Sequence, residues 1–222
     1  MRSFDEIHAI AAARKGGAEA LERMLPQPVA VEALRATTDD RWLSTMARCL
    51  FQAGFNWQVI EARWPGFEAA FGGFDPARVA MYHDAEMDRL LADSRIVRNG
   101  AKLAAVTANA GFLRAIAQEH GSMGAFVAGW PVSDHAGLLR LLSQRGARLG
   151  GVTGQRVLRE MGRDGYLLSA DVSARLVAEG VVAKPPSSQR DMAAVQAAFN
   201  AWGAQSGRSL AQISRVLAFS IG

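Results

Sequence analysis

An arginine-flanked, glycine-rich stretch at residues 145–165 contains the residue types best suited to hold an anion. Residues 150–154 predict a tight turn, because glycine accepts backbone angles closed to other residues, and a helix is expected directly after it, at residues 155–161. The start of a helix has unpaired N–H groups and the positive end of the helix dipole, so it attracts phosphate. An ordinary loop on a basic surface gives the same local pattern, and without other evidence that interpretation is favoured. The candidate phosphate contacts are Arg148, Gly150, Gly151, Thr153, Gly154, Gln155 and Arg156.

The composition limits the classes of protein to which the chain can belong. Half of its 222 residues are hydrophobic, which is enough for one large or two small domains. No apolar run is long enough to cross a membrane, and the N-terminus lacks the apolar segment of a signal peptide, so we expect a cytoplasmic protein. The single cysteine, Cys49, excludes an internal disulfide and a cysteine-rich metal site. A formal net charge of +4 permits a polyanionic partner.

Nearly every segment has helical periodicity, and no run alternates as a β-strand does. The sequence therefore predicts an all-α protein with about a dozen short helices, arranged in two lobes around a cleft. A helix break is expected at Pro65, and residues 184–188 resemble a linker. The longest predicted helix, residues 101–120, repeats apolar residues at helical spacing: Leu103, Val106, Ala110, Leu113 and Ile116. The predicted helix caps and starts are Ser3, Thr38 or Asp39, Asn56, Asp75, Asp84, Ser122, Ser133, Ser169 and Ser209, and Asn99-Gly100 precedes the longest helix.

Several blocks of sequence occur in an order and at a spacing typical of one protein family. They are FQAGFNW at residues 51–57, FDP with VA at residues 74–80, and IVRNGAK at residues 96–102, followed by Asn109-Ala110 and Gly121-Ser122. Together they resemble the 3-methyladenine DNA glycosylase I family across about residues 39–172. The resemblance implies an all-α fold of the helix-hairpin-helix DNA glycosylase superfamily. It also implies that residues 149–154 form the hairpin that anchors DNA.

The resemblance implies an enzyme that flips a damaged nucleotide out of double-stranded DNA and hydrolyses its N-glycosidic bond. Trp57 matches the pocket tryptophan of the family, whose face would attract the cationic 3-methyladenine base. Gln52 matches a position beside that pocket, and Asn56, next to Trp57, offers a second amide for hydrogen bonds to a base edge. Trp42 could line the same cavity. For each of these residues core packing or helix-end hydrogen bonding is the alternative interpretation.

The chain departs from the family at positions that matter for chemistry. Cys49 stands where the family has a glutamate that reads the base, and a thiol is a weaker hydrogen-bond acceptor than a carboxylate. Asp39, Asp40 and Glu61 are nearby carboxylates that could replace that glutamate. Asp171 lies in the region where related enzymes place a catalytic aspartate, although a solvated residue in the first turn of a helix is the simpler interpretation. The zinc ligands of the family are missing, so we expect neither a metal nor another cofactor.

These observations leave three hypotheses about function. The first is a monomeric, monofunctional DNA glycosylase of base-excision repair that acts on DNA containing alkylated purines, with 3-methyladenine as the leading substrate. The second is a non-catalytic helix-hairpin-helix DNA-binding protein, and the third is an all-α interaction protein that binds no nucleic acid. Release of free base separates the first from the second, and DNA binding at low salt separates the second from the third. We expect a glycosylase-like domain at residues 1–184, divergent over residues 1–38, and a helical extension at residues 185–222 packed on the same unit.

Overall fold

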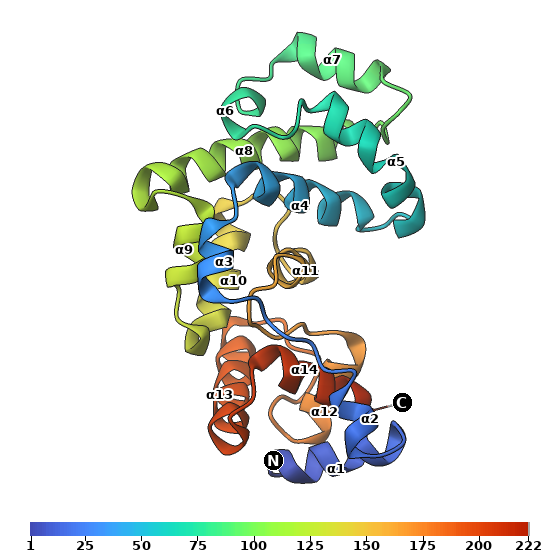
Figure 1. Ribbon diagram of the computed structural model, residues 1–222, viewed down its shortest axis with the longest axis vertical. Helices are drawn as coiled ribbons and strands as arrows, with labels where there is room; N and C mark the ends of the chain where they lie inside the picture. The colour runs from blue at the N-terminus through green and yellow to red at the C-terminus, as the bar shows by residue number, and fades with distance from the viewer. Residues whose placement is uncertain (222) are drawn as a thin grey trace. The chain divides into compact units, whose positions relative to one another are not determined.

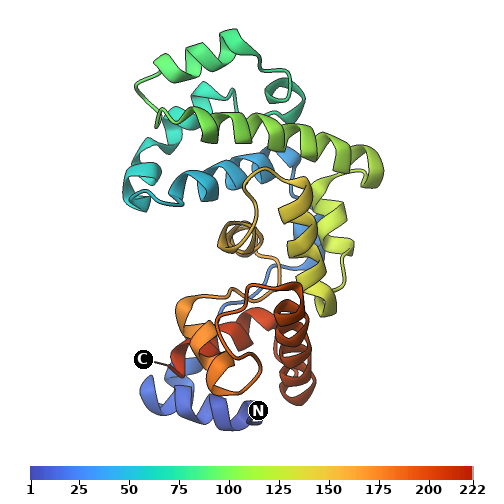
Figure 2. The ribbon, with the colours of Figure 1, turned by 180° about the vertical axis from the view of Figure 1, so that it is seen from behind.

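The computed structural model describes residues 1–221, which form fourteen α-helices and one short 3-10 helix and contain no strand (Figures 1 and 2). The predicted all-α class is therefore confirmed. The chain divides into two compact units. The central unit comprises residues 30–129 and 139–161. The terminal unit comprises residues 1–29, 130–138 and 162–221, so the two ends of the described chain belong to one unit.

The central unit is built around α4 (Asp39–Gln52), which lies between the long α8 (Gly100–His120) on one side and α11 (Val152–Glu160) on the other (Figures 1 and 2). The five apolar positions predicted for α8 are all buried, as the helical spacing requires. The remaining helices of this unit are α3 (Val31–Ala36), α5 (Trp57–Ala70), α6 (Pro76–Val79), α7 (Asp84–Ala92), α9 (Met123–Gly129) and most of α10 (His135–Arg145).

Helix α5 contradicts the predicted break at Pro65, because it continues through the proline to Ala70. A proline inside a helix removes one backbone hydrogen bond and costs about 3 kcal/mol. Packing on both sides of Pro65 offsets this cost. The Trp64 ring stacks on Phe67 with centroids 5.1 Å apart, and the Phe67 ring lies 4.7 Å from that of Phe51 on α4. The short α3 was not predicted at all, since Leu34 is its only buried residue and gives no periodicity.

Helix α11 begins earlier than the sequence predicts, at Val152 rather than residue 155. The glycine-rich turn therefore ends at Gly151, whose φ of 57° lies in the left-handed region that favours glycine. Thr153 and Gly154, predicted as loop residues, belong to the first helical turn.

The terminal unit contains α1 (Phe4–Arg14), α2 (Ala18–Glu22), η1 (Val132–Asp134), the first residues of α10, α12 (Ala170–Ala178), α13 (Gln189–Ser206) and α14 (Leu210–Phe219). A network of charged side chains joins its two ends. Glu179 accepts hydrogen bonds from the backbone N–H and the guanidinium of Arg2, both at 2.8 Å, and pairs with Arg175 at 3.2 Å. Arg175 also donates to Ser220 after α14. Residues 162–184 and 185–221 share this unit, and the predicted boundary at residue 184 stays a prediction.

Most of the predicted helix starts are confirmed, because caps are local signals. Asn56, Asp75, Asn99, Ser169 and Ser209 each accept a backbone N–H of the helix that follows, and Ser3 with Glu6 forms the predicted capping box. Two were displaced by one residue: His83 rather than Asp84 precedes α7, and Asp134 rather than Ser133 accepts the N–H of Gly137.

Candidate functional site

The predicted hairpin, residues 149–154, lies partly in the loop between α10 and α11, residues 146–151, and partly in the first turn of α11, in the central unit. The backbone of this loop bends sharply at Arg148, whose φ of 58° is unusual for a residue with a side chain. Leu149 is buried and anchors the loop. A Cβ at residue 154 would collide with the carbonyl oxygen of Leu149, so only glycine lets α11 start this close to the loop. Asn109 of α8 holds the loop from below, since its amide donates to the Ala147 carbonyl at 3.1 Å and accepts the Ala147 N–H at 2.7 Å.

The predicted DNA contacts on this hairpin divide into exposed and buried groups. Arg148, Gly151 and Arg156 are exposed, and Gly150 and Thr153 are half-buried.

The other two predicted contacts, Gly154 and Gln155, are buried, and the amide of Gln155 donates to the Gly151 carbonyl at 3.3 Å. These two residues shape the hairpin from inside. The prediction that they face an anion directly does not fit their burial.

The loop between α4 and α5, residues 53–56, contains Phe55 and the predicted pocket residue Asn56 and leads directly into Trp57. The ammonium of Lys102 on α8 donates to the carbonyls of Ala53 at 2.6 Å and Phe51 at 3.2 Å, and it lies 4.4 Å from the centre of the Phe55 ring. Burial lowers the pKa of Lys102, and the positive charge of Arg148 lowers it further. Hairpin and aromatic loop therefore lie near enough to influence each other through α8.

Trp57 is the first residue of α5, and 60% of its surface is exposed. Phe55 and Val59 beside it are also exposed, so the start of α5 presents an apolar surface. Asn56 caps α5 by accepting the N–H of Gln58 at 2.9 Å, which is the structural role foreseen as its alternative. Trp42, in contrast, is fully buried, as expected for a core residue. Of the two tryptophans predicted for the pocket, Trp57 is therefore the one that a ligand can reach.

Polar side chains from three helices meet beside Cys49. Glu61 of α5 accepts a hydrogen bond from the Gln52 amide at 2.7 Å, and Arg48 lies 3.9 Å from Glu61 and 3.6 Å from Glu160 of α11. Burial raises the pKa of the Cys49 thiol to about 12, and the negative charge of Glu160 adds to this effect. Cys49 is therefore a neutral thiol at physiological pH, and the carboxylate of Glu61 lies in the neighbourhood where the sequence predicted a replacement acid.

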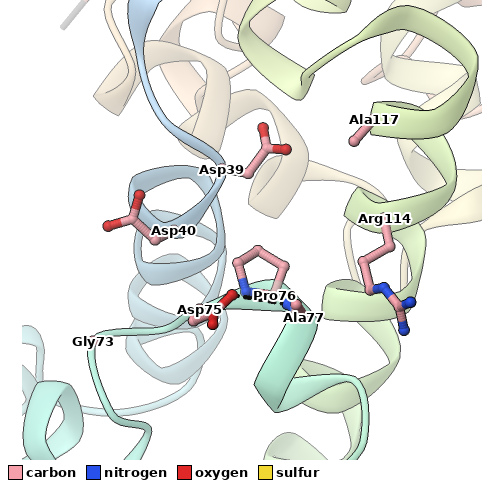
Figure 3. Close-up of a pocket in the computed structure, with 8 residues that line it drawn as sticks. All are labelled: Asp39, Asp40, Gly73, Asp75, Pro76, Ala77, Arg114 and Ala117. Carbon is pink, nitrogen blue, oxygen red and sulfur yellow. Dashed lines mark hydrogen bonds between the residues drawn. The ribbon is translucent and has the colours of Figure 1, made fainter.

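The opposite end of α4 carries the other two predicted replacement acids. Asp39 and Asp40 line an open pocket of about 510 Å³ with residues of α6 and α8, among them Pro76 and Arg114 (Figure 3). Asp39 accepts the N–H of Met123 at 2.8 Å and so caps α9, while Asp40 pairs with Arg41 at 2.8 Å.

Helix geometry separates Asp39 and Asp40 from Cys49 by about 15 Å along the axis of α4. The prediction that either carboxylate substitutes for an acid at Cys49 is therefore wrong. Asp171 is exposed in the first turn of α12, in the terminal unit. Within residues 1–221 no three His, Cys, Asp or Glu side chains are grouped to hold a metal ion, and no helix is long and apolar enough to span a membrane.

Sequence analysis missed three residues of this arrangement. Glu160 lies within the arginine-flanked stretch of residues 145–165, and no local signal pairs it with Arg48, which is more than a hundred residues away. Lys102 and Asn109 appeared only as parts of sequence blocks. Their spacing of seven residues, which places both on one face of a helix, was a signal that could have linked them.

The family model described as methyladenine glycosylase matches residues 35–145, half of the chain. The chain belongs to the methyladenine glycosylase family. The matched range runs from the end of α3 to the end of α10 and includes Cys49, Gln52 and Trp57. The hairpin loop and α11 lie beyond it. The family predicted from the sequence blocks is thus confirmed.

One curated relative within the methyladenine glycosylases is DNA-3-methyladenine glycosylase 1 of Escherichia coli (strain K12). The two proteins are 34% identical over 59 residues, which are 27% of this chain and 32% of the relative. The chain therefore matches about a third of the length of that relative.

Solved structures of glycosylases resemble the chain over a longer range. The 3-methyladenine DNA glycosylase I of Staphylococcus aureus matches with a TM-score of 0.52 and 27% identity, over 62% of this chain and 80% of that one. The 8-oxoguanine glycosylase/lyase of Methanocaldococcus jannaschii, solved with a 15mer DNA containing 8-oxoguanine, matches over 96% of both chains with a TM-score of 0.57. At 10% identity this second likeness concerns the fold alone. The predicted helix-hairpin-helix glycosylase-like fold is confirmed.

Proposed function

We propose that this protein is a DNA glycosylase that hydrolyses the N-glycosidic bond of alkylated purines, with 3-methyladenine as the leading substrate. The observation that carries the proposal is the exposed face of Trp57, at the family's tryptophan position and in the same compact unit as the arginine-flanked hairpin. The relatives from Escherichia coli and Staphylococcus aureus bear the name of 3-methyladenine glycosylases, which supports the choice of substrate.

Trp57 would bind the flipped base by stacking. A base methylated at a ring nitrogen carries positive charge while attached to the sugar, and an indole face attracts a cation. The same charge weakens the glycosidic bond, so few catalytic groups are needed and water would be the nucleophile. The amine of Lys102 is engaged as a hydrogen-bond donor to two backbone carbonyls, which argues against its use as a nucleophile.

Glu61 and Gln52 would read the edge of the stacked base. Trp57 and Glu61 are four residues apart on α5 and hence lie on one face of that helix. Because the Gln52 amide nitrogen donates to Glu61, its carbonyl oxygen is left as an acceptor. A carboxylate and an amide carbonyl together suit the exocyclic amine of an adenine derivative. In this proposal Glu61 supplies the charge that Cys49 cannot.

The hairpin would hold the DNA backbone. The N–H groups at the start of α11 and the dipole of that helix favour a phosphate there, and the exposed arginines Arg148 and Arg156 add positive charge. Gly150, Gly151 and Thr153 would let the backbone approach closely. The partner proposed for this surface is double-stranded DNA that contains the damaged base.

A non-catalytic DNA-binding protein is the second candidate function, and the neutral Cys49 at the position of the family's glutamate is the observation that favours it. Base release separates the two. Purified wild-type protein is incubated with methylated DNA and the released bases are identified by chromatography, alongside DNA binding measured at several salt concentrations. Salt-sensitive binding without any released base would establish the non-catalytic alternative.

Replacement of Trp57 tests the base platform. We expect Trp57→Ala to lower base release about 30-fold, which corresponds to a cation–π interaction of about 2 kcal/mol, while the thermal midpoint changes little because an exposed side chain contributes little to stability. Met81→Ala is the matched control, since Met81 is a similarly exposed apolar residue of the same unit and lies outside the proposed site. Equal release by wild type and Trp57→Ala would remove Trp57 from the pocket.

A further inference from the structure

Two buried polar side chains of α8 make their hydrogen bonds to the loops of the proposed site rather than to the core. Lys102 is 8% exposed and Asn109 is fully buried. They are seven residues apart, which places them on the same face of α8 and about 10 Å apart along its axis. Burial of polar groups is costly unless each one is hydrogen-bonded, so the partners of these two side chains indicate what they are for.

Lys102 holds the aromatic loop. Its ammonium meets two carbonyls at the C-terminal end of α4, where the helix dipole is negative, and it also faces the Phe55 ring. Each of these contacts lies within six residues of Trp57. Loss of the ammonium would leave both carbonyls without this donor and release the loop that precedes α5.

Asn109 holds the hairpin. Its side-chain amide donates to the carbonyl of Ala147 and accepts the N–H of the same residue, which is the pair of hydrogen bonds that two residues exchange in an antiparallel sheet. Such a pair of bonds restrains the loop in distance and in orientation. Arg148, the strained residue of the hairpin, is the next residue in the chain.

We propose that α8 sets the spacing between the phosphate-binding hairpin and the base-stacking loop, with Asn109 and Lys102 as the positioning residues at its two attachment points. The inference rests on the proposed function. A nucleotide can reach Trp57 only if its phosphate is held at the matching distance, and a displacement of about 1 Å in such a site can slow a reaction by about 100-fold. Neither residue touches the reacting atoms.

The test compares three variants on the same helix: Lys102→Met, Asn109→Leu and Thr107→Val. Thr107 is the control because its hydroxyl is buried and forms no hydrogen bond within residues 1–221. Hydrogen–deuterium exchange is measured first, since it needs no substrate. We expect Lys102→Met to speed exchange about tenfold in residues 53–57 only, since loss of a hydrogen bond from a charged group has roughly this effect.

Asn109→Leu is expected to speed exchange to a similar degree in residues 146–151 and to leave residues 53–57 unchanged. The faster exchange should include amides other than that of Ala147, which loses its own hydrogen bond to Asn109 in this variant. Should Asn109→Leu fold poorly, Asn109→Asp keeps the acceptor for the Ala147 N–H but repels the Ala147 carbonyl, and the same local change is expected. Thr107→Val is expected to change neither loop.

Kinetics then separate positioning from a general loss of structure. Lys102→Met should lower the rate of base release at saturating enzyme about tenfold or more while DNA affinity changes less than about threefold. Asn109→Leu should weaken DNA binding as well. Faster exchange throughout α4 and α8, or unchanged exchange in both loops, would overturn the inference. Absence of base release by the wild type would instead overturn the proposed function, and the exchange data would still decide the role of α8.

Discussion

Carboxylate side chains lie near both ends of α4, but their partners differ between the two ends. At its N-terminal end Asp39 and Asp40 are engaged by the N–H of Met123 and by Arg41. At its C-terminal end, about 20 Å away, the Gln52 amide contacts Glu61 beside the exposed Trp57. Carboxylates are favoured at the start of any helix by its dipole, so their presence at the first end needs no functional explanation. The second end has the exposed Trp57, and no structural role explains why this aromatic side chain faces solvent.

This contrast shows that the partner of a side chain is more informative than its type. Candidate acids were predicted near both ends: Asp39 and Asp40 at the first, and Glu61 at the second. Only the end with an acid, an amide and an aromatic face gathered from α4 and α5 can hold a cationic base between an acceptor and a ring.

Among the changes that compare the two ends of α4, removal of the negative charge at the C-terminal end should have the largest effect. Glu61→Gln keeps the shape of the side chain and an oxygen for the Gln52 amide, but loses the charge. We expect base release from methylated DNA to fall about 10- to 100-fold, the range for a hydrogen bond to a charged group, while the thermal midpoint stays near that of the wild type. Asp40→Asn, at the other end, should change release less than about twofold. Comparable losses in both variants would remove the distinction between the two ends.

Asp39 lies at the N-terminal end of α4 and caps α9, and loss of this cap should affect stability rather than activity. Asp39→Ala leaves the N–H of Met123 without its acceptor, which costs about 1 kcal/mol for a typical helix cap. A loss of this size lowers the thermal midpoint by about 2–4 °C in a chain of this length. Calorimetry measures the midpoint, and base release per folded molecule should remain at the wild-type level. A drop in release without a drop in the midpoint would instead place Asp39 in the reaction.

The pH dependence of stability gives a smaller and more specific test of the same residue. Burial raises the pKa of Asp39 above its ordinary value of 3.8, although the N–H of Met123 acts in the opposite direction. The folded state therefore holds the proton more tightly than the unfolded state, and ionisation lowers stability as the pH rises from below 3.8 through the raised pKa.

Asp39→Asn cannot ionise and keeps an oxygen for the N–H of Met123. Urea unfolding at a series of pH values gives the free energy of unfolding of both proteins. The value for the variant minus that for wild type should increase across that pH range and stay constant above it. A shift in favour of wild type over the same range would mean that the cap stabilises the ionised carboxylate more than burial disfavours it.

Local signals predicted much of the fold. The bounds of α14 follow from the cap at Ser209, and Asp75 with Pro76 marks the start of α6, because capping depends on residues adjacent in the chain. The break at Pro65 was wrong because the stacking of Trp64 on Phe67 outweighs a local preference. The start of α11 was misplaced because the need for glycine at residue 154 comes from contact with Leu149 and not from a turn.

The sequence by itself determined the helical class, most of the helix starts and the family, because periodicity, caps and ordered sequence blocks are properties of neighbouring residues. It also predicted Trp57 and the glycine-rich hairpin as site residues, and these roles stay predictions. Only the tertiary structure decided which acid lies near Cys49, that Arg48 meets Glu160, and that Lys102 and Asn109 hold two separate loops. Those pairings join residues 9 to 112 positions apart in the chain, and packing of whole helices brings them together.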